Sequence, residues 1–234
     1  VEKVIANSEY TKDLAIEKGV NKQKVKVINP GVNPPKELNK KSLEKVESLL
    51  KTKTPRLITV SRFDKRKNHE KVIMSLRNLK QIYPDIVYIC IGYGDEEENL
   101  KKLVEELNLG SQVMFFKDIT DDLKNSLIAK SHIFVMPSII HKKSVEGFGI
   151  AYVEAAQYGV PSLGGKDGGA SDAIEHDRTG LICDGNNLDD IYSSLNSMIE
   201  NKKYFELGRN AKEYVAKFQW EKIIDEYKKI LTVI

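Results

Sequence analysis

The chain has 234 residues, of which 41% are hydrophobic and 30% charged, and its formal net charge at pH 7 is +3. This composition is typical of a folded globular protein of one large or two small domains, and it argues against a disordered chain. The mild positive charge allows an anionic ligand, but the lysines are spread along the chain and no zinc-finger or RNA-binding motif occurs, so we expect no nucleic-acid partner.

The N-terminal segment predicts a strand, a helix and a second strand. Residues 3–7, with Val4-Ile5-Ala6 at their centre, are interpreted as the first strand, Ser8 can cap a helix that continues to about residue 18, and residues 25–28 are interpreted as the second strand. Asn33 is followed by two prolines, which predict a stiff, extended linker. We therefore divide the chain into residues 1–34 and residues 35–234.

The rest of the chain alternates between apolar runs and helical patterns. The predicted strands are 56–61, 86–91, 112–116, 132–136, 160–163 and 180–183. The predicted helices are 38–51, 68–82, 96–107, 121–130, a helix from Ile150 that stops at Gly159, and 170–175. This alternation predicts a doubly wound, Rossmann-like α/β fold with a parallel sheet.

The end of the chain is predicted to be a helical tail. The predicted helices are 188–200, 203–218 and one that begins at Trp220, with apolar side chains on one face. No apolar run approaches the about 18 residues that a membrane span needs.

Both cysteines lie in apolar, strand-like runs. Cys90 and Cys183 form no C-x-x-C motif, so we expect buried, reduced thiols rather than a disulfide or metal ligands. No secretory signal is recognisable, and the chain begins at Val1 without an initiator Met. We therefore expect a cytoplasmic protein and a processed or truncated chain.

A glycine-rich loop that enters a helix is the main candidate site. The segment Glu146-Gly147-Phe148-Gly149-Ile150 leads into the helix that begins at Ile150, and a second glycine-rich loop over 164–169 precedes the next predicted helix. The first N–H groups of a helix lack partners within the helix and lie at the positive end of its dipole, which favours phosphate binding.

Glu146 and Glu154 are separated by seven residues. Eight helical steps would span roughly 12 Å, which is longer than the about 5–9.5 Å between the paired carboxylates of glycoside hydrolases. The spacing suits two acceptors at opposite ends of one extended ligand, such as a nucleotide sugar. It equally allows one exposed helical Glu and one Glu favoured by the helix dipole.

A basic loop follows the first strand of the main domain. Arg62 and Lys67 lie where doubly wound sheets bind ligands, and both side chains can contact phosphate. A solvated basic loop is the alternative. We expect Lys65 and Arg66 to lie on the surface.

These motifs together resemble the donor-binding signature of retaining GT-B glycosyltransferases of family 4, the glycogen-synthase-like "group 1" transferases. The resemblance covers nearly the whole chain and implies the C-terminal, donor-binding half of a GT-B enzyme. It implies that residues 1–34 end an N-terminal acceptor domain, otherwise missing, and that the Trp220 helix crosses back to that domain.

The resemblance also implies a role for each site residue. Arg62, Lys67 and the backbone of Gly147, Phe148, Gly149 and Ile150 would bind the donor diphosphate, with Ser61 in place of the family's usual Gly. Glu154 would bind the ribose, and Glu146 would hold the transferred sugar as the catalytic carboxylate. Lys117 would lie near the base, although a structural cap by Asp118 is an equal explanation of that turn.

The implied ligand is a UDP- or GDP-sugar, with no cofactor and no metal. The implied acceptor is a glycan or a lipid-linked glycan of bacterial surface polysaccharide, such as lipopolysaccharide or capsule, made at the inner face of the plasma membrane by a peripherally associated enzyme. The isolated chain would be catalytically inactive. Two alternatives stay open: another GT-B enzyme, such as an epimerase or a phosphorylase, and a non-catalytic binding module.

Other sites are disfavoured by the sequence. The loop at Gly92 lacks the third glycine of a dinucleotide fingerprint, and the segment around Lys166 lacks the Ser/Thr of a P-loop. The histidines show no zinc-binding spacing. Residues 141–143 either form a loop that reaches toward an acceptor or donor phosphate or, as we expect, a solvated surface loop. We expect capping to explain the Asp pairs at 121–122 and 189–190.

Overall fold

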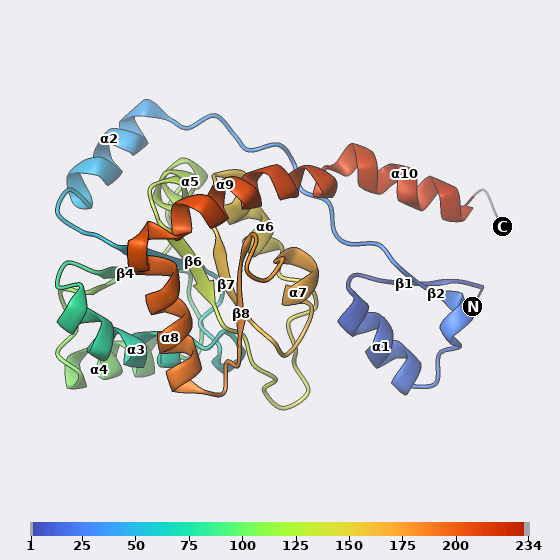
Figure 1. The fold of residues 1–234 in the computed structure, drawn as a ribbon, viewed down its shortest axis with the longest axis horizontal. Helices are drawn as coiled ribbons and strands as arrows, with labels where there is room; N and C mark the ends of the chain where they lie inside the picture. The colour runs from blue at the N-terminus through green and yellow to red at the C-terminus, as the bar shows by residue number, and fades with distance from the viewer. Residues whose placement is uncertain (1, 232–234) are drawn as a thin grey trace.

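The computed structural model describes residues 2–231, and its largest element is a sheet of six parallel strands (Figure 1). The strands are β3 (Arg56–Val60), β4 (Val87–Ile91), β5 (Val113–Phe116), β6 (Ile133–Met136), β7 (Ser162–Gly165) and β8 (Gly180–Cys183). Their order is β5-β4-β3-β6-β7-β8, and every neighbouring pair is parallel. The chain proceeds outward in one direction from β3 and in the other from β6. This doubly wound topology confirms the predicted fold.

Helices cover both faces of the sheet (Figure 1). One face packs against α3 (His69–Ile82), α4 (Glu97–Glu106) and α8 (Leu188–Ile199). The other packs against α2 (Lys40–Leu49), α5 (Asp121–Ala129), α6 (Ile150–Gln157) and α7 (Ala170–Ala173), and α9 (Tyr204–Tyr214) contributes to both cores. Successive strand residues point to opposite faces, so Leu57 lies in the first core and Ile58 in the second. Burial on both faces explains why the strands read as continuous apolar runs.

The N-terminal elements form a second, two-stranded parallel sheet. It contains β1 (Val4–Ala6) and β2 (Val25–Val27), connected by α1 (Glu9–Glu17), and it lies to one side of the large sheet in Figure 1. Ser8 caps α1 as predicted. The carboxylate of Asp172, in α7, accepts hydrogen bonds from Glu9 N at 3.0 Å and Asn29 Nδ2 at 3.1 Å and so joins the two parts. The domain boundary at residue 34 stays a prediction.

Two chain crossings between these parts run side by side. Val32 N donates to Phe218 O at 2.8 Å, and Val32 forms a parallel bridge with Gln219. The indole of Trp220 lies against the backbone of Gly31, where a Cβ atom would come within 2.5 Å of the ring. From there α10 (Trp220–Leu231) extends toward the N-terminal sheet (Figure 1).

Several local expectations were wrong. Strand β7 begins two residues later than predicted, so Gly164 and Gly165 lie inside the strand and not in a loop. A Cβ at Gly165 would approach the carbonyl oxygen of Ser138 to 2.0 Å, which explains a glycine within this strand. The predicted helix 203–218 is α-helical only to Tyr214 and continues as a 3-10 turn.

Two further features concern the caps and the thiols. Thr120 and Asn187 cap α5 and α8, whereas the Asp pairs expected to cap them lie in the first turns. Cys90 and Cys183 are free and buried, as predicted. Within residues 2–231, none of the helices combines the length and the apolar composition that a membrane span requires.

Candidate functional site

The strand order creates a crevice at the carboxyl ends of β3 and β6. Connections leave these two neighbouring strands in opposite directions, which is the point where open α/β sheets bind ligands. The loop after β3 carries Arg62 and Lys67, and the loop after β6 carries Glu146 and the glycines that lead into α6. The topology therefore brings together two motifs that are about 80 residues apart in the sequence. The contact between Lys67 and Glu146, which are 79 residues apart, joins the two loops.

The β3–α3 loop is held by two polar anchors. Asp64 caps a 3-10 turn (Lys65–Lys67) by accepting a hydrogen bond from Lys67 N at 3.1 Å. Asn68 adopts a left-handed conformation with φ +63°, and its side-chain amide donates to Pro137 O at 2.9 Å and Gly185 O at 2.8 Å. These bonds fix the turn against the β6–α6 loop and the loop that follows β8.

Three charged side chains converge in this crevice. Arg66 Nη1 donates to Glu146 Oε2 at 2.8 Å, and Lys67 Nζ donates to the same oxygen. The exposed fractions are 11% for Arg66, 13% for Lys67 and 12% for Glu146. Burial lowers the pKa of the Lys67 ammonium, although the Glu146 carboxylate opposes the shift.

Arg66 was expected on the surface, and this expectation was wrong. The 3-10 turn directs both Arg66 and Lys67 toward Glu146, whereas Lys65 remains exposed. The sequence signal for this arrangement is Asp64, whose position three residues before Lys67 suits a capped turn.

The glycine-rich loop is fitted closely to its neighbours. Glu146 forms a parallel bridge with Gly168, and Gly169 N donates to Glu146 O at 2.8 Å. Gly149 has φ +85° and is the N-cap of α6, while Phe148 is buried. Within residues 2–231, the N–H groups of 147–150 donate no hydrogen bond. They present unpaired donors at the positive end of the helix.

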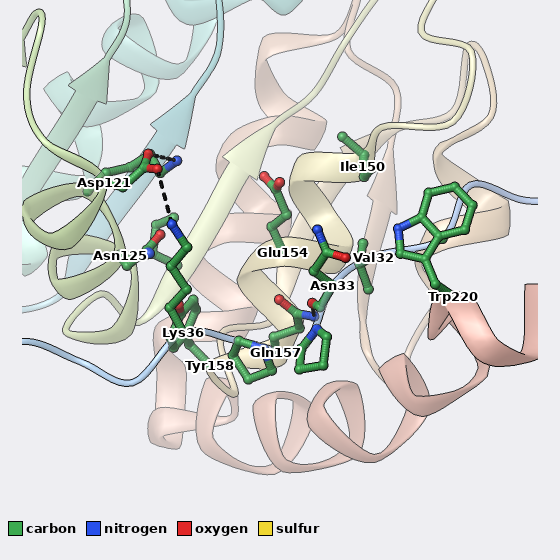
Figure 2. A pocket seen from close by; sticks show the side chains of 15 residues that line it. Val32, Asn33, Lys36, Asp121, Asn125, Ile150, Glu154, Gln157, Tyr158 and Trp220 are labelled. Carbon is green, nitrogen blue, oxygen red and sulfur yellow. Dashed lines mark hydrogen bonds and ion pairs between the residues drawn. The ribbon is translucent and has the colours of Figure 1, made fainter.

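Glu154 lies outside this charged cluster, in a groove of about 440 Å³ (Figure 2). The groove runs between the linker, α5 and α6, with Trp220 at one end, and Ile150 connects it to the glycine loop. Partial burial raises the pKa of the Glu154 carboxyl; Lys124 opposes this rise and Asp121 adds to it. The structure thus places the two glutamates in adjoining regions, with the first turn of α6 between them.

Two other predicted site residues are exposed. Arg62 is 73% exposed, and Nη2 lies 3.5 Å from Asp64 Oδ2. Lys117 lies at the end of β5 with its ammonium 5.9 Å from the ring centroid of Tyr93. The structure does not bring either side chain into the Glu146 cluster. Asp118 caps no helix here, since Thr120 caps α5.

The loop 141–143 forms a tight turn closed by a bridge between His141 and Ser144. Lys142 and Lys143 are exposed, as expected for a solvated loop. In the part of the chain that the structure describes, no group of three or more His, Cys, Asp or Glu side chains is arranged to hold a metal ion.

Comparison with known sequences identifies one matching family. The model of the family described as "Glycosyl transferases group 1" matches residues 40–218. A GDP-mannose-dependent alpha-(1-6)-phosphatidylinositol monomannoside mannosyltransferase of Mycobacterium tuberculosis H37Rv is 27% identical over 71% of this chain and 44% of its own length. A Haemophilus influenzae protein described only as a glycosyltransferase is 27% identical over 98% of this chain and 61% of its own length. The chain therefore spans about half of the length of these relatives.

Solved structures show the same fold. Anabaena HepE in complex with UDP and glucose superposes with a TM-score of 0.85, at 22% identity, over 100% of this chain and 64% of that chain.

Proposed function

Because the chain belongs to the group 1 glycosyl transferases, we propose that it is the donor-binding part of an enzyme that transfers a sugar from a UDP- or GDP-sugar. The acceptor is a glycan or a lipid-linked glycan, and the anomeric configuration is retained. The acceptor supplies the hydroxyl that receives the sugar, and it binds to the part of the relatives' length that this chain does not span. Two similar proteins support the nucleotide sugar, since one relative is GDP-mannose-dependent and one solved structure contains UDP.

One observation carries this proposal: Lys67 contacts Glu146, and the four residues after Glu146 present unpaired backbone N–H groups. A cation beside a helix N-terminus is a suitable site for a diphosphate. The same groups would stabilise the negative charge that develops on the diphosphate as the glycosidic bond breaks. Arg62, which is exposed at the rim, would add a second, mobile phosphate contact.

The groove at Glu154 suits the nucleoside part of the donor. Ile150 both begins α6 and lines this groove, so a ligand whose phosphates bind at the helix N-terminus can extend directly into it. The Glu154 carboxylate would accept hydrogen bonds from the ribose hydroxyls, and Lys117 would lie beside the base. Glu146 would hold hydroxyls of the transferred sugar, so that the donor is positioned for the acceptor.

The environment of the reaction is also part of the proposal. We place the enzyme in the cytoplasm, where the two free cysteines would remain reduced, and at the inner face of a membrane during transfer to lipid-linked acceptors. The cations at the diphosphate would take the place of a metal ion.

Calorimetric titration of the chain with UDP, GDP and ADP, with and without magnesium, tests this function. We expect saturable binding of UDP or GDP that magnesium does not change. Lys67→Ala should weaken binding by tenfold or more, because charge-assisted hydrogen bonds are worth about 1.5–3 kcal/mol, with little change in Tm. A folded chain that binds none of the three nucleotides would contradict the donor site, and a magnesium requirement would contradict the metal-free site.

The same titration, with a ribonucleotide and its 2′-deoxy analogue, tests the contact between Glu154 and the ribose. Glu154→Ala should weaken binding of the ribonucleotide more than binding of its 2′-deoxy analogue, because only the ribonucleotide presents the second hydroxyl. Gln157→Ala, in the same groove, is the control and should affect both ligands equally. Equal losses for Glu154→Ala would remove this residue from the ribose.

A further inference from the structure

The two oxygens of the Glu146 carboxylate have different environments. Oε2 accepts hydrogen bonds from both Arg66 and Lys67. Oε1 has no hydrogen-bond partner within residues 2–231. One oxygen is therefore shared by two cations, while the other is available.

The two cations differ in how firmly they are held. The guanidinium of Arg66 bonds Glu146 through Nη1 at 2.8 Å, and its Nη2 lies 3.9 Å from Asp64 Oδ2. Arg66 is thus fixed between two carboxylates. The only side-chain partner of the Lys67 ammonium among the described residues is Glu146. Its flexible stem allows the ammonium to turn to another anion.

The cluster also contains more positive than negative charge. Within residues 2–231, three cations, Arg62, Arg66 and Lys67, contact only two carboxylates, Asp64 and Glu146. Arg66 Nε is buried without a partner in the described part of the chain. Buried charge is costly unless it is paired, so this cluster favours an additional anion.

We infer that, when no donor is bound, the Glu146 carboxylate pairs with the Lys67 ammonium at the place where a donor phosphate would bind. When the diphosphate pairs with Lys67 instead, Arg66 is the residue that keeps Glu146 in position. This inference rests on the proposed donor function. In the bound state, Lys67 pairs with the diphosphate, Arg66 keeps Oε2, and Oε1 can accept a hydrogen bond from the transferred sugar. Glu146 is thus a competitor of the phosphates and a partner of the sugar.

This arrangement makes an unusual prediction for the variant Glu146→Gln. The amide keeps the size of the side chain and removes its negative charge, so Lys67 is released for phosphate. Nucleoside diphosphate, which lacks the sugar, should bind about three- to tenfold more tightly than to the unchanged chain, because Lys67 no longer has to leave the Glu146 carboxylate to reach a phosphate. A Glu146 that contacted only the sugar would leave this affinity unchanged.

The role of Arg66 is tested by comparing ligands with and without the sugar. UDP and UDP-glucose, or GDP and GDP-mannose, are titrated into Arg66→Gln and Arg66→Lys. We expect both variants to lose about fivefold in affinity for the nucleotide sugar relative to the nucleoside diphosphate, because Glu146 is no longer oriented. Arg66→Lys keeps the charge, so it separates the effect of geometry from that of charge. Lys65→Gln, the exposed neighbour, is the matched control and should leave this ratio unchanged.

The outcomes separate this inference from the proposed function. If the unchanged chain binds UDP or GDP but Glu146→Gln binds it equally or more weakly, Glu146 is not a competitor and the inference is overturned. If the Arg66 variants weaken both ligands in the same proportion and lower Tm, Arg66 is only structural. If the unchanged chain binds no nucleotide, the proposed function fails, and this inference fails with it.

Discussion

At the scale of single residues, burial of His69 makes the stability of the folded protein depend on pH. The ring lies at the first turn of α3, 2% exposed and 4.9 Å from the ring of Phe63. Burial, with a smaller effect of the Lys67 charge, lowers its pKa to about 3. As the pH falls below about 6.5, the His69 ring therefore binds a proton in the unfolded chain, whereas in the folded chain it stays neutral until the pH approaches 3. The stabilising effect of the neutral ring is complete above pH 6.5 and is lost as the pH falls toward 3.

His69→Gln should reduce the loss of stability on acidification. Between pH 7.5 and pH 5, the unchanged His69 costs about 2 kcal/mol of unfolding free energy, from 1.36 kcal/mol per pH unit. Denaturant unfolding at the two pH values measures this difference, which should shrink by that amount in the variant. His141→Gln, in the exposed loop, should leave it unchanged. An identical pH dependence in both variants would show that the His69 ring is not excluded from protonation.

The predictability of the site differs between its residues. Lys67 and Glu146 could be named from motifs, because the chemistry of each follows from its position after a strand or before a helix. Arg66 could not, because adjacent basic residues look alike in a sequence and only the turn capped by Asp64 decides which of them point inward. The shared use of one carboxylate oxygen is likewise a property of the folded loops.

At the scale of elements, the entry into α6 depends on Gly149. The residue has φ +85°, and a Cβ atom would lie 2.3 Å from the ring of Tyr152. Tyr152 is 1% exposed, and its hydroxyl donates to Met136 O at 2.6 Å, so the ring has little room to move. The left-handed conformation at Gly149 lets the chain turn from the loop into α6.

Gly149→Ala should destabilise the protein by about 1–3 kcal/mol, because the new methyl adds both strain and overpacking. It should also weaken nucleotide binding, since the N–H groups at the start of α6 are displaced. Thermal unfolding and titration measure the two effects. Gly110→Ala is the matched control, because a Cβ there meets no atom within 4 Å and should change neither. Unchanged affinity in Gly149→Ala would argue against a role of this helix end in binding.

The helices and strands of the main sheet followed the sequence pattern closely, and the exception has a physical reason. β7 is Ser162–Gly165, although the apolar run Val160–Leu163 was expected to form it. Glycines normally weaken a strand, so the pattern favoured the apolar residues. Contact between Gly165 and the backbone of Ser138, which is far away in the sequence, reverses that preference.

At the scale of the whole molecule, the fold class followed from the alternation of elements, whereas the strand order did not. The pairing of β3 with β6, which creates the crevice, joins segments separated by two complete βα units. Sequence periodicity predicts only which side of each helix or strand is buried. It does not predict which strands pair, so the β3–β6 pairing is known only from the structure. The arrangement of the two sheets depends in the same way on distant contacts such as the crossing at Trp220.

Trp220→Ala should loosen this crossing. Loss of the indole from the backbone of Gly31 should cost about 2 kcal/mol of local stability, consistent with a half-buried aromatic side chain. Hydrogen exchange at Val32 N, which donates to Phe218 O, should become faster, while exchange in β3 and β4 stays slow. Tyr227→Ala, farther along α10, is the control. Equal exchange at Val32 in both variants would show that the indole does not hold the crossing.

The paired crossings also determine how the molecule can bend. We expect two adjacent segments joined at Val32 and Phe218 to resist twisting and shear, and to leave rotation about their common line, opposed by the Asp172 hydrogen bonds, as the softest motion of the N-terminal sheet relative to the large one. Val32 and Trp220 line the groove that contains Glu154, so this groove lies on the axis, where displacements are smallest (Figure 2). Under the proposed function, such a pivot would keep the groove for the nucleoside almost constant in shape, and the change in width would be concentrated where the sugar would meet its acceptor.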